Sequence, residues 1–221
     1  MDKSSKNYIE LTHDVRPKRE KHWLSVFHQL TVPACLEDVH SVLEFGPGRG
    51  FLGAVLKYYG VEYFAADVVD HGAKPDFLCD IMSFPEDKTF DLVCAFQALE
   101  HNPPETYVLH LKKMAAASNK YVYISLPYYG RWLSLSLSVN LPKINRNFIK
   151  TFTLDRLPIK RPIEKYRESK TPYAHHWFEV GDKGFKKKDL IEHAEKAGLK
   201  ITEMKHSHSF PYHIFILMEK V

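Results

Sequence analysis

The sequence predicts an α/β domain in which helices cover both faces of a mostly parallel sheet. From residue 41 to residue 126, short apolar segments with strand character alternate with helical segments. This alternation is typical of a doubly wound sheet. A turn with three glycines, Gly46-Pro47-Gly48-Arg49-Gly50, follows the first strand, and a helix with two strands closes the chain. We therefore expect a single domain over residues 1–221.

Seven segments have the composition and the length of strands. They are short, rich in β-branched and aromatic residues, and bounded by glycine, proline or acidic residues. The seven expected strands are 41–45, 61–66, 76–79, 90–95, 120–126, 199–206 and 211–219. The first five alternate with helices, and the last two form a closing pair.

Three helices are expected between these strands. The first covers 51–59 and ends at Gly60. The second covers about 103–117, because a proline suits a first helical turn, and Asn102 is expected to cap it. The third covers 186–198, with apolar residues on one side and a glycine as its stop.

The first 40 residues are expected to form an arm and a helix. Residues 1–17 are polar, and from residue 18 onward apolar side chains recur at spacings of three and four. That spacing places them on one helical face, which we expect to pack against the core. These residues are Trp23, Val26, Phe27 and Leu30.

Composition indicates an ordinary globular protein. Of the 221 residues, 44% are hydrophobic and 26% are charged, and the net charge of +4 does not by itself indicate nucleic acid. Three cysteines without CxxC spacing predict neither a disulfide framework nor a cysteine-rich zinc site, and they favour a reducing compartment. No signal-like or membrane-spanning apolar segment is present, so we expect a cytoplasmic protein.

The glycine turn is suited to a nucleoside ligand. Glycine accepts positive φ and has no Cβ, so a ligand can lie almost against the backbone. In an open parallel sheet, ligands bind beyond the carboxyl ends of the strands, where this turn is expected. Amides at the start of the helix after Gly50 can donate hydrogen bonds to a carboxylate.

Two aspartates follow the next strands at the same expected edge. Asp67 lies 17 residues after Gly50, a spacing that suits a carboxylate accepting both ribose hydroxyls. Asp80 follows the third strand and could accept from an adenine amino group, with Ile81 packing on the ring. Each aspartate alone is weak evidence for a ligand. Together with the glycine turn, however, they mark three strand ends in register, which predict a nucleoside site.

These motifs resemble those of the class I S-adenosylmethionine-dependent methyltransferases, particularly their small-molecule enzymes. The resemblance covers residues 40–126 well and 186–220 by pattern. It rests on residues 43–50, Asp67, Asp80, Phe90-Asp91-Leu92-Val93 and Leu99-Glu100-His101. It implies a Rossmann-like seven-stranded sheet with an antiparallel last strand and an insertion after strand five, S-adenosyl-L-methionine as cofactor, and a small-molecule acceptor.

The resemblance also implies the residues that hold the cofactor. Glu44 would orient the glycine loop and the methionine amine, and the end of strand four would line the methionine side of the pocket. The full implied set is Glu44, Gly46, Pro47, Gly48, Gly50, Asp67, Asp80, Ile81, Ala95, Phe96 and Gln97.

Two other motif matches are weaker. Residues 48–53 match the GxGxxG pattern of dinucleotide oxidoreductases, but the glycine that directly follows the strand is Gly46, so the match is out of register. Asn102-Pro103-Pro104-Glu105 looks like a motif of amino-group methyltransferases that act on adenine or glutamine. It lies beyond the end of strand four and lacks the aromatic residue, so we do not expect a base-modifying enzyme.

Candidate catalytic residues are histidines. Methyl transfer needs an in-line approach, and it needs a general base only where the nucleophile arrives protonated. Neutral imidazole is a competent base near neutral pH, and the candidates are His101, His175 and His176. No metal site is expected: no acidic cluster suggests Mg²⁺, and the histidines of the closing strands are interpreted as surface residues, namely His206, His208 and His213.

Residues 127–185 are expected to be an insertion on the substrate side. They contain five prolines and no long periodic element, although the alternation over 133–139 fits either a strand or a one-sided helix. Between Lys143 and Lys170, nine basic and three acidic residues give a net charge of +6. A basic cap favours an anionic acceptor, and a solvated basic face explains the same charges equally well. We predict O-directed transfer to a small molecule, with an RNA methyltransferase or a non-catalytic cofactor-binding module as alternatives.

Overall fold

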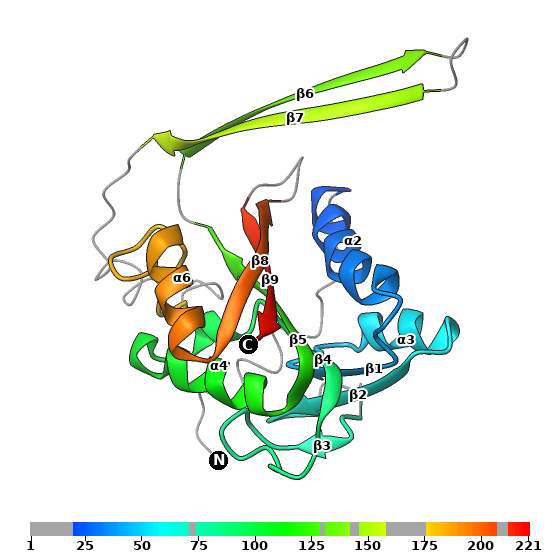
Figure 1. Cartoon of the computed structure of the whole chain (residues 1–221), viewed down its shortest axis with the longest axis vertical. Helices are drawn as coiled ribbons and strands as arrows, with labels where there is room; N and C mark the ends of the chain where they lie inside the picture. The colour runs from blue at the N-terminus through cyan, green and yellow to red at the C-terminus, as the bar shows by residue number, and fades with distance from the viewer. Residues whose placement is uncertain (1–19, 71–73, 129–130, 142–145, 158–175, 207–211) are drawn as a thin grey trace.

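The computed structural model describes residues 20–70, 74–128, 131–141, 146–157, 176–206 and 212–221. Its body is a seven-stranded sheet in the order β3-β2-β1-β4-β5-β9-β8, flanked by helices (Figure 1). The strands are β1 (Ser41–Phe45), β2 (Glu62–Asp67), β3 (Phe77–Leu78), β4 (Phe90–Phe96), β5 (Ser118–Pro127), β8 (Leu199–His206) and β9 (His213–Lys220). The first five strands in this order, β3, β2, β1, β4 and β5, pair in parallel, and β9 is antiparallel to both of its neighbours. The predicted doubly wound sheet with an antiparallel last strand is confirmed.

Alternate strand residues divide the core into two layers. Val93 of β4 and Val122 of β5 belong to the layer that includes residues of α4 (Tyr107–Ala116) and α6 (Lys187–Lys196). Leu92 and Tyr123, their chain neighbours, belong to the layer that includes residues of α2 (Glu20–Cys35) and α3 (Phe51–Tyr58). Successive strand side chains point to opposite faces, so a sheet buried on both faces must be apolar at nearly every position. This requirement explains the continuous apolar runs of the central strands.

Helix α2 packs differently from the expectation. Trp23 and Phe27 are 50% and 59% exposed, whereas the buried positions of the helix are Ser25, His28, Val32 and Pro33. The main-chain carbonyl of His28 accepts a hydrogen bond from the Tyr123 hydroxyl at 2.8 Å. The predicted core face is therefore wrong at Trp23 and Phe27, whereas Leu30 is half-buried and packs against the core. On the inner face, the Ser25 hydroxyl forms a hydrogen bond with His213 Nδ1, and the His28 ring packs against the Phe215 ring.

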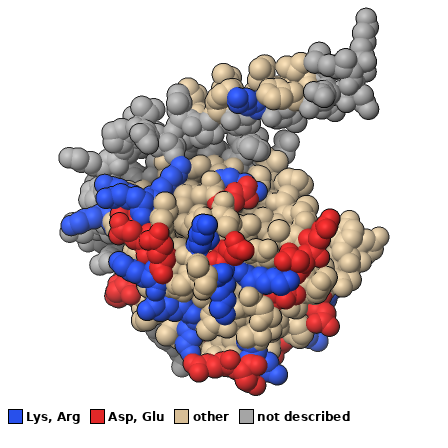
Figure 2. Space-filling view, in the orientation of Figure 1, with Lys and Arg blue, Asp and Glu red and all other residues tan. Residues whose placement is uncertain are grey.

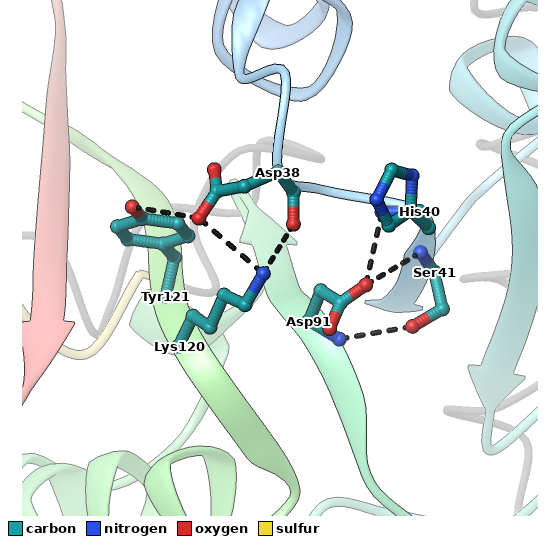
Figure 3. A network of polar contacts seen from close by, with 6 residues as sticks. All are labelled: Asp38, His40, Ser41, Asp91, Lys120 and Tyr121. Atoms are coloured by element: carbon teal, nitrogen blue, oxygen red, sulfur yellow. Dashed lines mark hydrogen bonds and ion pairs between the residues drawn. The ribbon is translucent and has the colours of Figure 1, made fainter.

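A polar network joins the amino ends of three strands (Figure 3). The Asp91 carboxylate accepts from the main-chain amides of His40 and Ser41 at 2.9 and 3.2 Å, while the Ser41 hydroxyl accepts from the Asp91 amide at 3.0 Å. Lys120 forms an ion pair with Asp38 at 3.3 Å. This network fixes the register of β1, β4 and β5 at the edge opposite the glycine turn.

The segment after β5 contains a long hairpin. Strands β6 (Arg131–Leu141) and β7 (Arg146–Leu157) form a separate two-stranded antiparallel sheet that extends beyond the end of β5 (Figure 1). The expectation that no long periodic element exists over 127–185 is therefore wrong, and the alternation at 133–139 is a strand. On one face of the hairpin, exposed apolar side chains come together: Leu133, Leu135, Leu137, Phe148 and Phe152.

Two local expectations also need correction. Strand β3 is two residues long, so Asp80 lies two positions beyond its end rather than directly at it. The Asn102 side-chain amide donates to the carbonyls of Ala98 and Leu99 at 3.3 and 3.5 Å. It therefore closes the 3₁₀ helix η1 (Leu99–His101) and does not cap the helix that follows, which is preceded by a second 3₁₀ helix, η2 (Pro104–Thr106).

Among the described residues, no helix combines the length and the apolar character needed to cross a membrane. The face of the body seen in Figure 2 carries Lys and Arg side chains interspersed with Asp and Glu. Most basic side chains of the predicted cap, residues 143–170, lie outside the described residues.

Substitution of Gly53 tests how α3 packs on the sheet. A Cβ at this position would overlap the Tyr63 ring, 2.5 Å from Cδ1. We expect Gly53→Ala to lower the free energy of unfolding by about 1–3 kcal/mol, because a filled core must shift to admit an added methyl group. Urea unfolding measures the change. Ala54→Ser, at an exposed position of the same helix, is the control, and equal stabilities of the two variants would contradict this packing.

Candidate functional site

The glycine turn has left-handed backbone at all three glycines. The φ values of Gly46, Gly48 and Gly50 are 70°, 55° and 71°. A Cβ at Gly46 would lie 3.1 Å from the Ala98 Cβ, whereas a Cβ at Gly48 would meet no atom within 4 Å. The turn is therefore packed closely against the end of β4 on one side and has free space on the other. The helix α3 starts directly after Gly50 with no side-chain cap, so its first amides point toward this space.

Glu44 lies beneath the turn as a buried acid. Its carboxylate accepts a hydrogen bond from the Tyr63 hydroxyl at 2.5 Å. Burial raises the pKa of Glu44 to about 7, against the opposing effect of the Tyr63 hydrogen bond and with a smaller contribution from the charge of Asp67. Burial and the Glu44 charge also raise the pKa of Tyr63. A carboxylate held in this way favours a positively charged ligand group.

Asp67 and Asp80 occupy the same edge of the sheet. Asp67 is the last residue of β2, and its Oδ1 accepts from the Val69 amide at 3.3 Å. Asp80 is exposed, and its Oδ1 accepts from the Ser83 amide and hydroxyl at 2.7 and 2.6 Å. These hydrogen bonds hold the pKa of Asp80 below its ordinary value. Ile81, next to Asp80, is buried.

The end of β4 turns sharply. Gln97 has a φ of 52°, a rare value for a residue other than glycine, and its side-chain amide donates to the Ser125 hydroxyl at 3.1 Å. Phe96 packs into the core, with its ring 5.3 Å from the Tyr123 ring, and Ala95 is fully buried. Strain of this kind is concentrated at functional sites. The turn directs the chain from the sheet into η1.

An acid–imidazole cluster lies directly after this turn. Its members are Glu100, His101, His176 and Glu179. The rings of His101 and His176 are 5.1 Å apart and nearly perpendicular, and His176 Nδ1 lies 3.0 Å from a Glu179 carboxylate oxygen. Glu100 is fully buried, and neither of its carboxylate oxygens has a hydrogen-bond partner among the described residues.

Electrostatics couple these groups. Burial raises the pKa of Glu100 to about 7, partly offset by His176. Burial alone would lower the pKa of His176, but the hydrogen bond to Glu179 and the charges of Glu100 and Glu179 outweigh it and raise that pKa above its ordinary value.

Main-chain hydrogen bonds bring the two parts of the cluster together. The Trp177 amide donates to the Glu100 carbonyl at 2.8 Å, and the Val180 amide donates to the Pro127 carbonyl at 2.8 Å. Phe178 stacks on Phe185 with ring centroids 3.9 Å apart, which anchors the segment 176–180 in the core. Residues far apart in sequence thereby meet just after Ala98, the residue that packs on Gly46.

Most residues predicted for the site lie at this edge. The turn, Glu44, Asp67 and the end of β4 are grouped there, and His101 and His176 are in contact. His175 lies outside the described residues, as does His208. The sequence analysis missed Tyr63, Glu100 and Glu179 as site residues. Of these three residues, only Glu100 could have been found from local sequence, because it stands beside the candidate His101 shortly after a buried strand.

The strand order and the antiparallel last strands are those of a Rossmann-like methyltransferase fold. A model of the family described as methyltransferase domain matches residues 16–204. The chain belongs to this family, and it is an S-adenosylmethionine-dependent methyltransferase. Among curated protein sequences, none matches the chain significantly.

Solved structures share the fold. The magnesium protoporphyrin IX methyltransferase of Synechocystis PCC 6803, with bound S-adenosylhomocysteine, is 15% identical with a TM-score of 0.57, over 100% of this chain and 89% of that one. The 1,6-didemethyltoxoflavin-N1-methyltransferase of Burkholderia thailandensis is 14% identical with a TM-score of 0.59, over 99% and 86%. An amino pentose methyltransferase of Micromonospora echinaspora is 12% identical with a TM-score of 0.56, over 93% of each chain.

The buried Glu44 predicts a pH dependence of stability. Below its ordinary pKa of 4.5, the carboxyl is protonated in folded and unfolded chains alike. As the pH rises, the unfolded chain loses this proton first, which favours unfolding until the folded carboxyl also ionises near pH 7. Between these pH values, the free energy of unfolding of the wild type should fall relative to Glu44→Gln by up to roughly 3 kcal/mol.

Urea unfolding without cofactor, at a series of pH values, measures this difference. Glu62→Gln, at an exposed position on the neighbouring strand, is the control and should follow the wild type. Parallel curves for the wild type and Glu44→Gln would show that the burial of Glu44 carries no such cost.

Asp67 gives a direct test of cofactor binding. We expect Asp67→Ala to weaken S-adenosylmethionine binding about 10- to 100-fold, the range for a lost charge-assisted hydrogen bond. Calorimetry on the folded variant measures the affinity. Asp87→Ala, at an exposed position, should bind as the wild type does. Unchanged affinity in folded Asp67→Ala would exclude this residue from the cofactor site.

Proposed function

We propose that the enzyme transfers a methyl group from S-adenosylmethionine to an oxygen atom of a small, anionic acceptor. The observation that carries this proposal is the contact between His101 and His176, which follows closely on Ala98, the residue that packs on Gly46. A sulfonium methyl donor needs no activation by the protein, but a hydroxyl acceptor must lose a proton. A pair of imidazoles at the expected methyl position meets that need.

The residues present fit the cofactor. Glu44 would hold its ammonium group, the first amides of α3 its carboxylate, and Asp67 the ribose hydroxyls. Gln97 and the glycine turn would bound its methionine end, and Asp80 with Ile81 its adenine end. The bound cofactor supplies an electrophilic methyl group. Every other contribution to the reaction comes from positioning, desolvation and proton removal.

Proton removal is assigned to the cluster after β4. Glu179 orients His176 through Nδ1, so that Nε2 is the nitrogen able to take a proton. His101 contacts this ring and lies three residues beyond Ala98, which packs on Gly46. The acceptor's oxygen would therefore lie between the cluster and the glycine turn.

We further propose that residues 127–185 cover the acceptor and that residues 1–40 form an N-terminal arm and helix. The hairpin extends from the end of β5, the same edge at which the cluster lies (Figure 1). Its exposed apolar face could contact an aromatic or aliphatic part of the acceptor, and the basic residues of 143–170 favour a carboxylate or phosphate on it.

Nitrogen acceptors are the second candidate. Two of the similar structures are an N1-methyltransferase and an amino pentose methyltransferase by their names. An amine nucleophile arrives unprotonated more readily than an alcohol and needs less help from a base. A nucleic-acid acceptor is the third, and steeply salt-dependent binding to tRNA would favour it.

The histidine variants separate these candidates. With phenols and hydroxy acids as acceptors, His101→Gln and His176→Gln should lower turnover by about 10²- to 10⁴-fold, the usual contribution of proton transfer. Release of S-adenosylhomocysteine measures the rate. His40→Gln, at an exposed position on the opposite edge of the sheet, should retain full turnover. Full turnover on a hydroxyl acceptor in both cluster variants would contradict the proposal.

A further inference from the structure

Three side chains of the cluster converge as ligands to a metal would. Glu100, His101 and His176 each place one carboxylate oxygen or ring nitrogen within 4.8 Å of the atoms offered by the other two. Glu100 and His101 come from η1, and His176 comes from the segment that returns to the sheet after the hairpin. We propose that these three side chains bind a divalent first-row transition-metal ion.

Glu100 is the strongest reason for a cation at this point. Its side chain is completely buried, and both carboxylate oxygens lack a hydrogen-bond partner within the described part of the chain. A buried carboxylate without a partner is costly, and proteins place such a group there when an ion pair or a metal compensates it. The ion pairs among the described residues do not include Glu100.

Glu179 supports His176 as a ligand. Its Oε1 lies 3.0 Å from His176 Nδ1 and accepts a hydrogen bond from the Tyr212 hydroxyl at 3.2 Å. Metal-binding histidines donate their second ring N–H to a carboxylate in this way, which fixes the tautomer. With Nδ1 engaged, Nε2 carries the lone pair that a metal needs. Glu179 is itself buried, so the ring is held firmly.

The ligand types define the class of ion. Two imidazoles and one carboxylate suit Zn²⁺, Fe²⁺, Mn²⁺ or Co²⁺, whereas Mg²⁺ and Ca²⁺ prefer oxygen ligands throughout. Three protein ligands leave coordination positions open, as in metal sites that meet a substrate. The prediction from sequence that no metal is bound considered acidic clusters and the closing-strand histidines, and it did not consider this combination.

The position of the site suggests its use, and this step rests on the proposed function. Through Ala98, the cluster adjoins the glycine turn, where the methyl donor is proposed to lie. A divalent cation there would lower the pKa of an acceptor hydroxyl, whose proton would pass to solvent. The oxygen would then take the methyl group as the sulfonium becomes a thioether. His101 and His176 would then act as metal ligands, and this role replaces the role as bases proposed above.

Metal titration of the full chain tests the site without cofactor or acceptor. After treatment with a chelator, the wild type should bind one Co²⁺ per chain with a visible ligand-field spectrum, and Zn²⁺ should displace it. Glu100→Gln and His176→Gln should each weaken Co²⁺ binding at least about 100-fold, and Glu179→Gln should weaken it about 10- to 100-fold, as the loss of an outer-shell partner does. His40→Gln should match the wild type.

The outcomes separate the site from the proposed reaction. Absence of saturable Co²⁺ and Zn²⁺ binding, or equal binding by the wild type and by folded Glu100→Gln and His176→Gln, would overturn the metal site and leave methyl transfer untouched. Preference for Mg²⁺ over Co²⁺ would overturn the class of ion. One bound Co²⁺ that is lost in both variants establishes the site, even if the loaded enzyme methylates no hydroxyl acceptor, a result that would count against the proposed function alone. Melting curves show whether each variant is folded.

Discussion

The close contact between Gly46 and Ala98 joins the two halves of this site. On one side, the left-handed glycine turn exposes backbone and helix amides above the buried Glu44. On the other side, the chain leaves β4 through the strained Gln97 and reaches Glu100 and His101 within four residues. A Cβ at Gly46 would lie 3.1 Å from the Ala98 Cβ, so a side chain there would push Ala98 away and change the distance between the cofactor edge and the cluster. Methyl transfer depends on such a fixed distance, because near-attack geometry supplies most of its rate.

The sheet and the cofactor edge were predictable because their signals are local. Continuous apolar runs specify strands buried on both faces, and three glycines in five residues specify a turn that excludes Cβ atoms. The hairpin was not predictable to the same degree. Its alternating leucines and serines fit a strand, but the apolar face is exposed, so no core position confirmed that period. The predicted burial of Trp23 and Phe27 was wrong for a related reason. Helical spacing places residues on one face of a helix, but it does not show whether that face is buried.

The acid–imidazole cluster marks the limit of sequence interpretation. His101 and His176 could be named as candidates from the sequence. Glu100 and Glu179 can be recognised as site residues only once the segment 176–180 lies beside the ends of β4 and β5. That juxtaposition depends on the Trp177 and Val180 amides and on the stacking of Phe178 with Phe185. Each of these contacts is tertiary, and none has a sequence spacing that predicts it.

Two buried carboxylates, one on each side of the contact between Gly46 and Ala98, have the same electrostatic property. Glu44 and Glu100 both have a pKa raised to about 7 by burial, so each destabilises the ligand-free fold when it ionises. A protein selected for stability alone would replace them with apolar or amide side chains, since burying a charge without a full partner is unfavourable. Their presence is explained if each faces a positive charge in the working enzyme: an ammonium group at Glu44 and a metal ion at Glu100. Ligand binding would then offset the free-energy cost of burying both carboxylates.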